Sequence, residues 1–119
     1  MIPIEDWKWF GLPGHLCIAS ECRFHMVTQV GKYLISTIGE YVYKGKRTEI
    51  GLDRYLETMV FIAGKPCKNK GCLCGMPETS GEEIDDQGYK TAGEAQVGHM
   101  KLCWEYANRE TLETEKDKT

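Results

Sequence analysis

Two kinds of hydrophobic period divide the chain. Between residues 16 and 63, short runs rich in β-branched and aromatic residues are separated by glycine-containing turns, which is typical of strands joined by tight turns. Gly31-Lys32 lies between two such runs and predicts a hairpin. Because the runs are joined by turns rather than by helix-length connections, the predicted sheet is antiparallel. The expected strands are residues 16–19, 24–30, 33–38, 41–43 and 57–63.

A helical period replaces this pattern near the C-terminus. Thr91 and Glu94 have the spacing of a capping box, in which each side chain satisfies a free backbone N–H group. The spacing predicts a helix from about Ala92 to about Ala107, roughly 24 Å long at 1.5 Å per residue. One face of this helix would carry Ala95, His99, Leu102, Cys103 and Tyr106.

The remaining segments show neither period. Residues 64–90 contain glycines, prolines and cysteines and are predicted to form a loop, whereas the charged residues 109–119 are predicted to form a frayed tail. We therefore expect an α+β fold: a small antiparallel sheet, a cysteine-rich loop and one C-terminal helix. A chain of 119 residues fits one domain, which we place at residues 1–108.

The N-terminal segment is rich in aromatic residues. Trp7, Trp9 and Phe10 stand between two prolines. Large aromatic side chains are usually buried, so we predict an arm that covers one edge of the core. A partner-binding aromatic patch is the alternative.

The charge balance bears on the choice of partner. The net charge is -3 and the sequence pI is near 5.6, which disfavours a general nucleic-acid binder. Lys65, Lys68 and Lys70 form the only candidate basic patch. The acidic run at residues 82–86 is interpreted as a solvated loop rather than as an acid and base pair.

No targeting or membrane segment is expected. The first residues lack the basic and apolar regions of a leader peptide. The longest apolar run, residues 59–63, is far too short to span a bilayer. The predicted location is therefore the cytoplasm, where clustered cysteines are more often metal ligands than disulfides.

The strongest chemical signal is a group of cysteine and histidine residues in the C-terminal half. Zinc sites commonly pair two cysteines in a turn with two further ligands three to five residues apart. The turn would supply its ligands from Cys67, Cys72 and Cys74, and the helix from His99 and Cys103. On a helix, residues four apart lie one above the other, so this group predicts a zinc ion that pins the helix to the sheet.

Alternatives remain open for this group. Five candidates compete for four positions, so Cys72 and Cys74 are possible alternatives to each other, or His99 supports a ligand without binding zinc itself. The cysteines could instead be ordinary buried thiols, or form disulfides, which the predicted compartment disfavours. An N-terminal group of His15, Cys22 and His25 is a weaker candidate for a second site or for ligands of the first. Alternation along a strand would place His15 and Cys17 on one face, so one of the two could simply be a core residue.

Three blocks of this sequence resemble a group of small proteins encoded by tailed bacteriophages. The blocks run from Cys22-Arg23-Phe24-His25 to Tyr41, from Glu57-Thr58-Met59-Val60-Phe61 to Cys67, and from Cys72-x-Cys74-Gly75-Met76-Pro77 to His99-Met100-x-x-Cys103. The resemblance covers most of residues 9–107, although those proteins often carry a longer insertion near residues 43–50. No activity is established for the group. The resemblance implies expression in the bacterial cytoplasm during infection.

Two classes of function follow. The sequence has no phosphate-binding glycine loop, nucleophile elbow or metalloprotease helix motif, which favours a zinc-stabilised phage accessory protein that binds a host protein over an enzyme. Such a protein would act in host takeover or against host defence. The alternative is a zinc-dependent enzyme acting on nucleotides or nucleic acid, which requires an open coordination position. A virion component is a third, weaker option.

Overall fold

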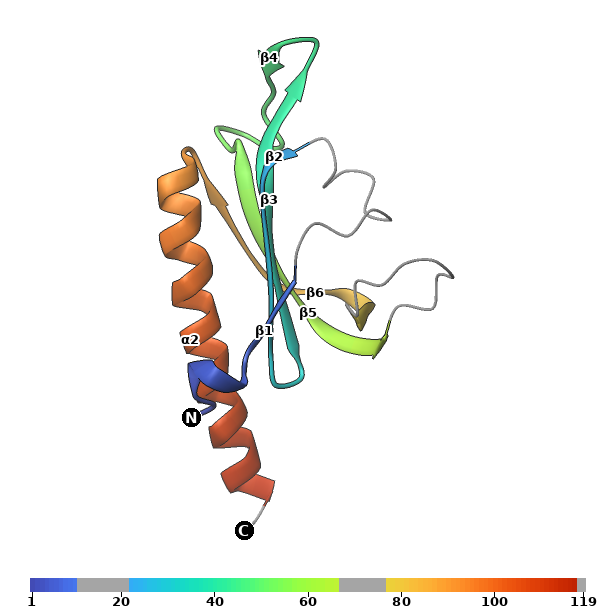
Figure 1. Cartoon of the computed structure of the whole chain (residues 1–119), viewed down its shortest axis with the longest axis vertical. Helices are drawn as coiled ribbons and strands as arrows, with labels where there is room; N and C mark the ends of the chain where they lie inside the picture. The colour runs from blue at the N-terminus through green and yellow to red at the C-terminus, as the bar shows by residue number, and fades with distance from the viewer. Residues whose placement is uncertain (11–21, 67–76, 118–119) are drawn as a thin grey trace.

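The described residues form one antiparallel sheet and one long helix. The computed structural model describes residues 1–10, 22–66 and 77–117 (Figure 1). The elements are the 3-10 helix η1 (Ile4–Asp6), the strands β1 (Lys8–Phe10), β2 (Cys22–Val30), β3 (Tyr33–Tyr43), β4 (Lys46–Arg47), β5 (Leu56–Pro66) and β6 (Pro77–Tyr89), and the helix α2 (Ala92–Asp117). The strand order is β1-β2-β3-β5-β6, and β4 pairs with β3. The predicted α+β class and antiparallel sheet are confirmed.

The first hairpin follows the prediction closely. β2 and β3 meet at the turn of Gly31 and Lys32, where Val30 pairs with Tyr33 and Gly31 has a positive φ of 60°. β3 then continues to Tyr43, so the short run at 41–43 belongs to this strand rather than to a separate one. The predicted run at 16–19 lies outside the described residues.

The main correction concerns β6. Residues 77–89 were expected in a loop, but they form a strand that pairs with β5 from Leu56↔Tyr89 to Pro66↔Pro77, with register shifts on the way. Backbone hydrogen bonds to a neighbouring strand need no particular side chains, and an edge strand tolerates charged residues. The cysteine-rich segment 67–76 therefore joins β5 to β6, and the sheet resumes before the helix begins.

The helix begins where the capping signal predicted. The Glu94 amide donates to Thr91 Oγ1 at 3.1 Å, and Glu94 Oε2 accepts from the Lys90 amide at 3.2 Å. The helix continues to Asp117 instead of ending near Ala107. Glutamate and lysine have high intrinsic helix propensities, which accounts for the extension.

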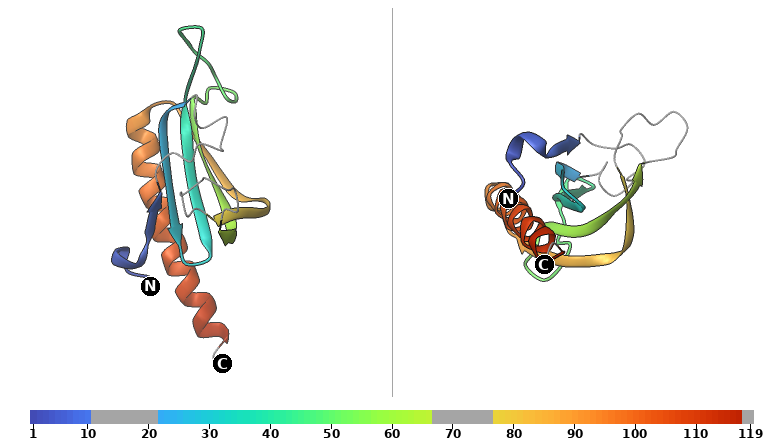
Figure 2. Two further views of the ribbon diagram at one scale, coloured as in Figure 1. Left: turned by 45° about the vertical axis from the view of Figure 1, so that its right-hand side comes forward. Right: turned by 90° about the horizontal axis from the view of Figure 1, so that it is seen from below.

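The main core lies between α2 and one face of the sheet (Figure 2). The helical face predicted from the sequence is buried, and the rings of Tyr106 and Tyr33 meet edge to face at 4.6 Å. The opposite face, called the distal face, carries a smaller cluster built on Val27 and Leu34. The paired ends of β5 and β6 curve to that side, away from α2 (Figure 2). The core under the helix contains Trp7, Val30, Tyr33, Ile35, Val60, Leu102, Cys103, Tyr106 and Ala107.

Candidate functional site

Two threonine hydroxyls hold His99 beneath the helix. Its Nε2 lies 2.8 Å from Thr28 Oγ1, and its Nδ1 lies 2.7 Å from Thr37 Oγ1. All three side chains are fully buried. A neutral imidazole has one donor and one acceptor nitrogen, so one hydroxyl accepts a hydrogen bond from the ring and the other donates to it.

This hydrogen-bonded chain continues across the sheet. Thr37 pairs with Thr58 on β5, and their hydroxyl oxygens are 2.5 Å apart. Thr58 Oγ1 is in turn 3.0 Å from the Tyr89 hydroxyl on β6. Alternation along the strands points Thr28, Thr37 and Thr58 at the helix. The chain of hydroxyls thus connects four strands to α2 through a single imidazole.

Burial keeps the side chains of His99 and Cys103, both on α2, uncharged. It lowers the pKa of His99 to about 4, and the charge of His25 acts in the same direction. Burial also raises the pKa of the Cys103 thiol to about 12, although a hydrogen bond with Thr28 acts against this rise. At neutral pH the helix therefore presents a neutral imidazole and a protonated thiol to the sheet.

This geometry bears directly on the predicted zinc ligands. A zinc ligand needs a free imidazole nitrogen, whereas both ring nitrogens of His99 lie within hydrogen-bond distance of threonine hydroxyls in this structure. These contacts fasten the helix to the sheet in this arrangement. Five other candidate ligands have side chains that the structure does not describe: His15, Cys22, Cys67, Cys72 and Cys74. Within the described ranges, no three His, Cys, Asp or Glu side chains form a metal-binding group.

His25 occupies the contrasting position on the distal face. It belongs to β2, where it pairs with Ile38, and alternation directs its side chain away from α2. Both ring nitrogens are buried, and neither has a hydrogen-bond partner in the part of the chain that is described. Burial lowers the pKa of this imidazole too. A buried polar group without a partner costs about 1–3 kcal/mol, so this position is suited to a further ligand.

A cluster of three tryptophans joins the N-terminal segment to the helix. Trp7 is buried, donates from Nε1 to the Ile2 carbonyl at 3.1 Å, and meets Trp104 edge to face at 4.7 Å. The Trp9 ring lies 6.0 Å from Trp7. Trp9 is 47% exposed and Trp104 37% exposed, so the predicted arm covers the core through Trp7 and leaves aromatic surface in solvent. Trp7, Trp9 and Trp104 are called the tryptophan patch.

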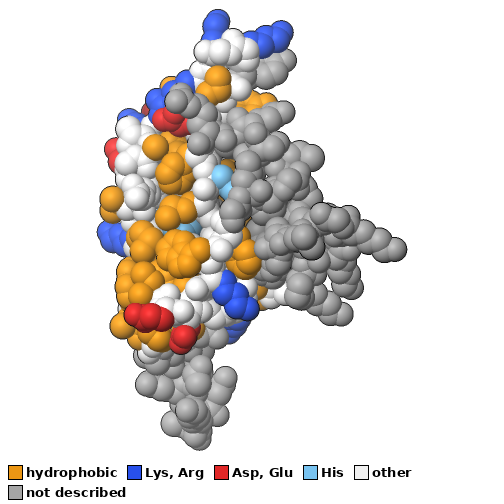
Figure 3. Space-filling view, viewed as in Figure 1, with side chains coloured by type: hydrophobic (Ala, Val, Ile, Leu, Met, Phe, Trp, Pro, Cys, Tyr) orange, Lys and Arg blue, Asp and Glu red, His pale blue; other side chains and the backbone are white. Residues whose placement is uncertain are grey.

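The tryptophan patch lies on a surface rich in hydrophobic side chains. Figure 3 shows these side chains gathered between α2 and the N-terminal segment. Trp104 carried no signal in the sequence because it lies outside the buried helical face. Only the approach of η1 and β1 to the helix brings it against Trp7.

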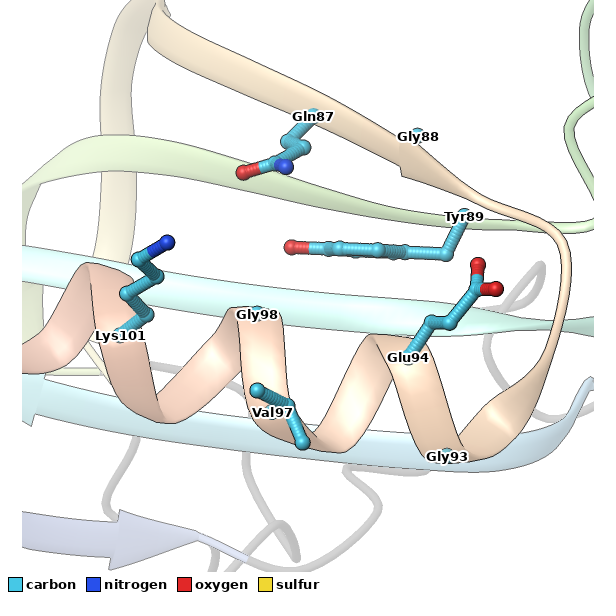
Figure 4. Close-up of a pocket in the computed structure, with 8 residues that line it drawn as sticks. All are labelled: Gln87, Gly88, Tyr89, Gly93, Glu94, Val97, Gly98 and Lys101. Atoms are coloured by element: carbon cyan, nitrogen blue, oxygen red, sulfur yellow. The ribbon is translucent and has the colours of Figure 1, made fainter.

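A groove lies on the other flank of α2, beside β6. Its volume is about 520 Å³. The ring of Tyr89 lies against Gly98, where any side chain would collide with it. This glycine therefore permits the close approach of helix and strand. The groove is lined by Gln87, Gly88, Tyr89, Gly93, Glu94, Val97, Gly98 and Lys101 (Figure 4).

Comparison with known proteins does not assign this arrangement to a family. No family model, curated protein or solved structure matches the chain. Among the described residues, no helix is both long and apolar enough to cross a membrane. The function is therefore argued from the surfaces and side chains described above.

Proposed function

We propose that this chain is a non-catalytic binding protein that engages a partner protein through the tryptophan patch. The supporting observation is the exposure of Trp9 and Trp104 around the buried ring of Trp7. Tryptophan is enriched at the centres of protein interfaces, where it adds a large apolar area at low cost in side-chain entropy. Contact with Trp7 also restrains the two exposed rings before any partner arrives.

The surroundings of the tryptophan patch also resemble an interface. Glu5, Asp6, Lys8 and Glu105 are exposed and close in sequence to the three rings. A polar rim around an apolar centre is the usual anatomy of a protein interface. Both signs of charge occur in this rim, which supports a protein partner over a uniformly charged polymer.

The resemblance to small phage-encoded proteins supplies the setting for this proposal. A phage accessory protein acts on components of the bacterial host, so the partner would be a host protein involved in takeover or defence. The net charge of -3 agrees with a protein partner better than with nucleic acid.

We further propose that zinc completes the distal face, with His25 as one ligand. The supporting observation is the pair of buried ring nitrogens without a partner. Imidazole and thiolate are suitable zinc ligands, and the sequence supplies cysteines at 22, 67, 72 and 74 as well as His15. Four protein ligands would make the site structural, whereas an open position would favour the zinc-dependent enzyme instead.

Affinity capture from bacterial lysate tests the binding proposal. The immobilised chain should retain one host protein stoichiometrically, and Trp9→Ala/Trp104→Ala should reduce its recovery at least tenfold. Leu52→Ala is the matched control, because Leu52 is 90% exposed and lies outside the tryptophan patch. Melting curves would establish that both variants fold. Equal recovery by the double variant and the wild type would overturn the proposal.

A further inference from the structure

The outer edge of β6 is open in the described part of the chain. β6 has 13 residues and ends the strand order, with β5 as its only partner among the described strands. The outward N–H and C=O groups of such an edge form a template on which another strand can add. Proteins that bind extended peptides commonly use an edge of this kind.

The groove provides side-chain specificity beside this edge. α2 runs alongside the C-terminal part of β6, with the Tyr89 ring between them (Figure 4). Alternate side chains of an added strand would point toward the helix side of the sheet. There they would meet mainly Val97, which is 68% exposed, beside the edge of Tyr89, which is 6% exposed. The groove therefore suits one or two apolar side chains of an extended segment.

The charge around the edge identifies the kind of segment. Glu83 and Asp86 are exposed on β6, and Glu94 is exposed at the start of α2. After burial, the charges of Glu83 and Asp86 are among the causes that raise the pKa of Glu57 on the neighbouring strand. This edge therefore has a negative potential that favours lysine and arginine in its ligand.

Two cationic side chains, those of Lys101 and Arg54, reduce the negative charge near β6 but do not cancel it. Lys101 lines the groove at the opposite end from Glu94 (Figure 4). The two ends of the groove therefore carry opposite charges. The Arg54 side chain lies against Gly88 of β6, and its charge lowers the pKa of Glu57, so it offsets part of the negative charge at the C-terminal end of the strand. A second copy of this chain is a poor occupant, because pairing two β6 edges brings acidic strands together, and like charges across a sheet are destabilising.

We infer that the groove between β6 and α2 binds an extended basic segment of a partner protein, which adds as a strand to the outer edge of β6. Backbone hydrogen bonds would supply affinity. Apolar side chains in the groove, and basic side chains facing Glu83 and Asp86, would supply specificity. This site lies on the opposite flank of α2 from the tryptophan patch and does not depend on it.

Synthetic peptides test the inference with the full chain. The probe is a fluorescent eight-residue peptide of alternating lysine and valine, and binding is measured by fluorescence anisotropy at low salt. Two peptides serve as controls: one has glutamate in place of lysine, and the other carries N-methyl groups on alternate amides, which block strand pairing. Saturable binding of the basic peptide is expected, with at least tenfold weaker binding of both controls.

Charge-reversal variants locate the binding on the protein. Glu83→Lys/Asp86→Lys should weaken binding of the basic peptide at least tenfold. Glu5→Lys/Asp6→Lys makes the same change in net charge on the other flank and should leave binding within twofold. Equal binding of the N-methylated peptide, equal losses in both variants, or no saturable binding would overturn the inference. So would a dimer in analytical ultracentrifugation that Glu83→Lys/Asp86→Lys abolishes.

Discussion

His99 and His25 lie on opposite faces of the same sheet, and their surroundings differ in one respect. His99 has a hydroxyl partner for each ring nitrogen, whereas both nitrogens of His25 are buried without one in the described residues. The face under the helix is therefore complete as a folded core. On the distal face, the His25 nitrogens have no partner among the described residues, and the metal proposal is made there for this reason.

The largest expected effect concerns His25 on the distal face. His25→Ala should remove most of the bound zinc and lower the unfolding free energy by more than about 5 kcal/mol, because metal binding contributes directly to folding in small sites. Elemental analysis and urea unfolding measure the two quantities. With a chelator present, the same substitution should change stability by less than about 1 kcal/mol. Unchanged zinc content would exclude His25 as a ligand.

The second largest expected effect concerns His99, on the face of the sheet that α2 covers. His99→Ala should lower the unfolding free energy by about 3–5 kcal/mol with or without zinc, because it leaves a cavity and two buried hydroxyls without their partner. Urea unfolding in zinc and in chelator provides the test. The triple variant His99→Leu/Thr28→Val/Thr37→Val should recover part of the loss. Loss of zinc in His99→Ala would instead support the ligand set predicted from the sequence.

Lowering the pH should lower the free energy of unfolding, because His99 takes up a proton more readily in the unfolded chain. Its pKa is about 4 in the folded chain, against 6.5 for an unperturbed imidazole, so the unfolded chain binds more protons between these values. The stabilisation is complete above about pH 6.5 and falls by about 2–3 kcal/mol as the pH drops toward 4. Urea unfolding from pH 7 to pH 4 should show this slope in His25→Ala as well. A slope of equal size in His25→Ala/His99→Leu would assign it to other groups.

A smaller effect separates packing from metal binding at Cys103. The side chain is fully buried, and its thiol keeps its proton because its pKa is raised to about 12. Cys103→Ser should therefore cost about 1–3 kcal/mol by burying a hydroxyl, with zinc content unchanged. Cys103→Ala is the matched apolar control. A fall in zinc content for both variants would show that the thiol is a ligand after all.

Local signals account for the parts of the fold that were predicted correctly. The capping spacing of Thr91 and Glu94 acts within one helical turn, and the hairpin at Gly31 depends on adjacent residues. β6 carried no such signal, because its strand conformation comes from pairing with β5. The helix beyond Ala107 was missed for another reason: charged residues there suggested solvent exposure, which is compatible with helix as well as with coil.

Periods of two and 3.6 residues, together with neighbouring side chains, were enough to predict the fold class, the first hairpin, the start of the helix and the face that the helix buries. The partners of the buried polar groups, in contrast, follow from the packing of the helix on the sheet. His99 bonds to threonines 71 and 62 residues away, and Trp104 contacts Trp7 from the other end of the chain. Such contacts depend on how sheet and helix pack, which no local spacing records.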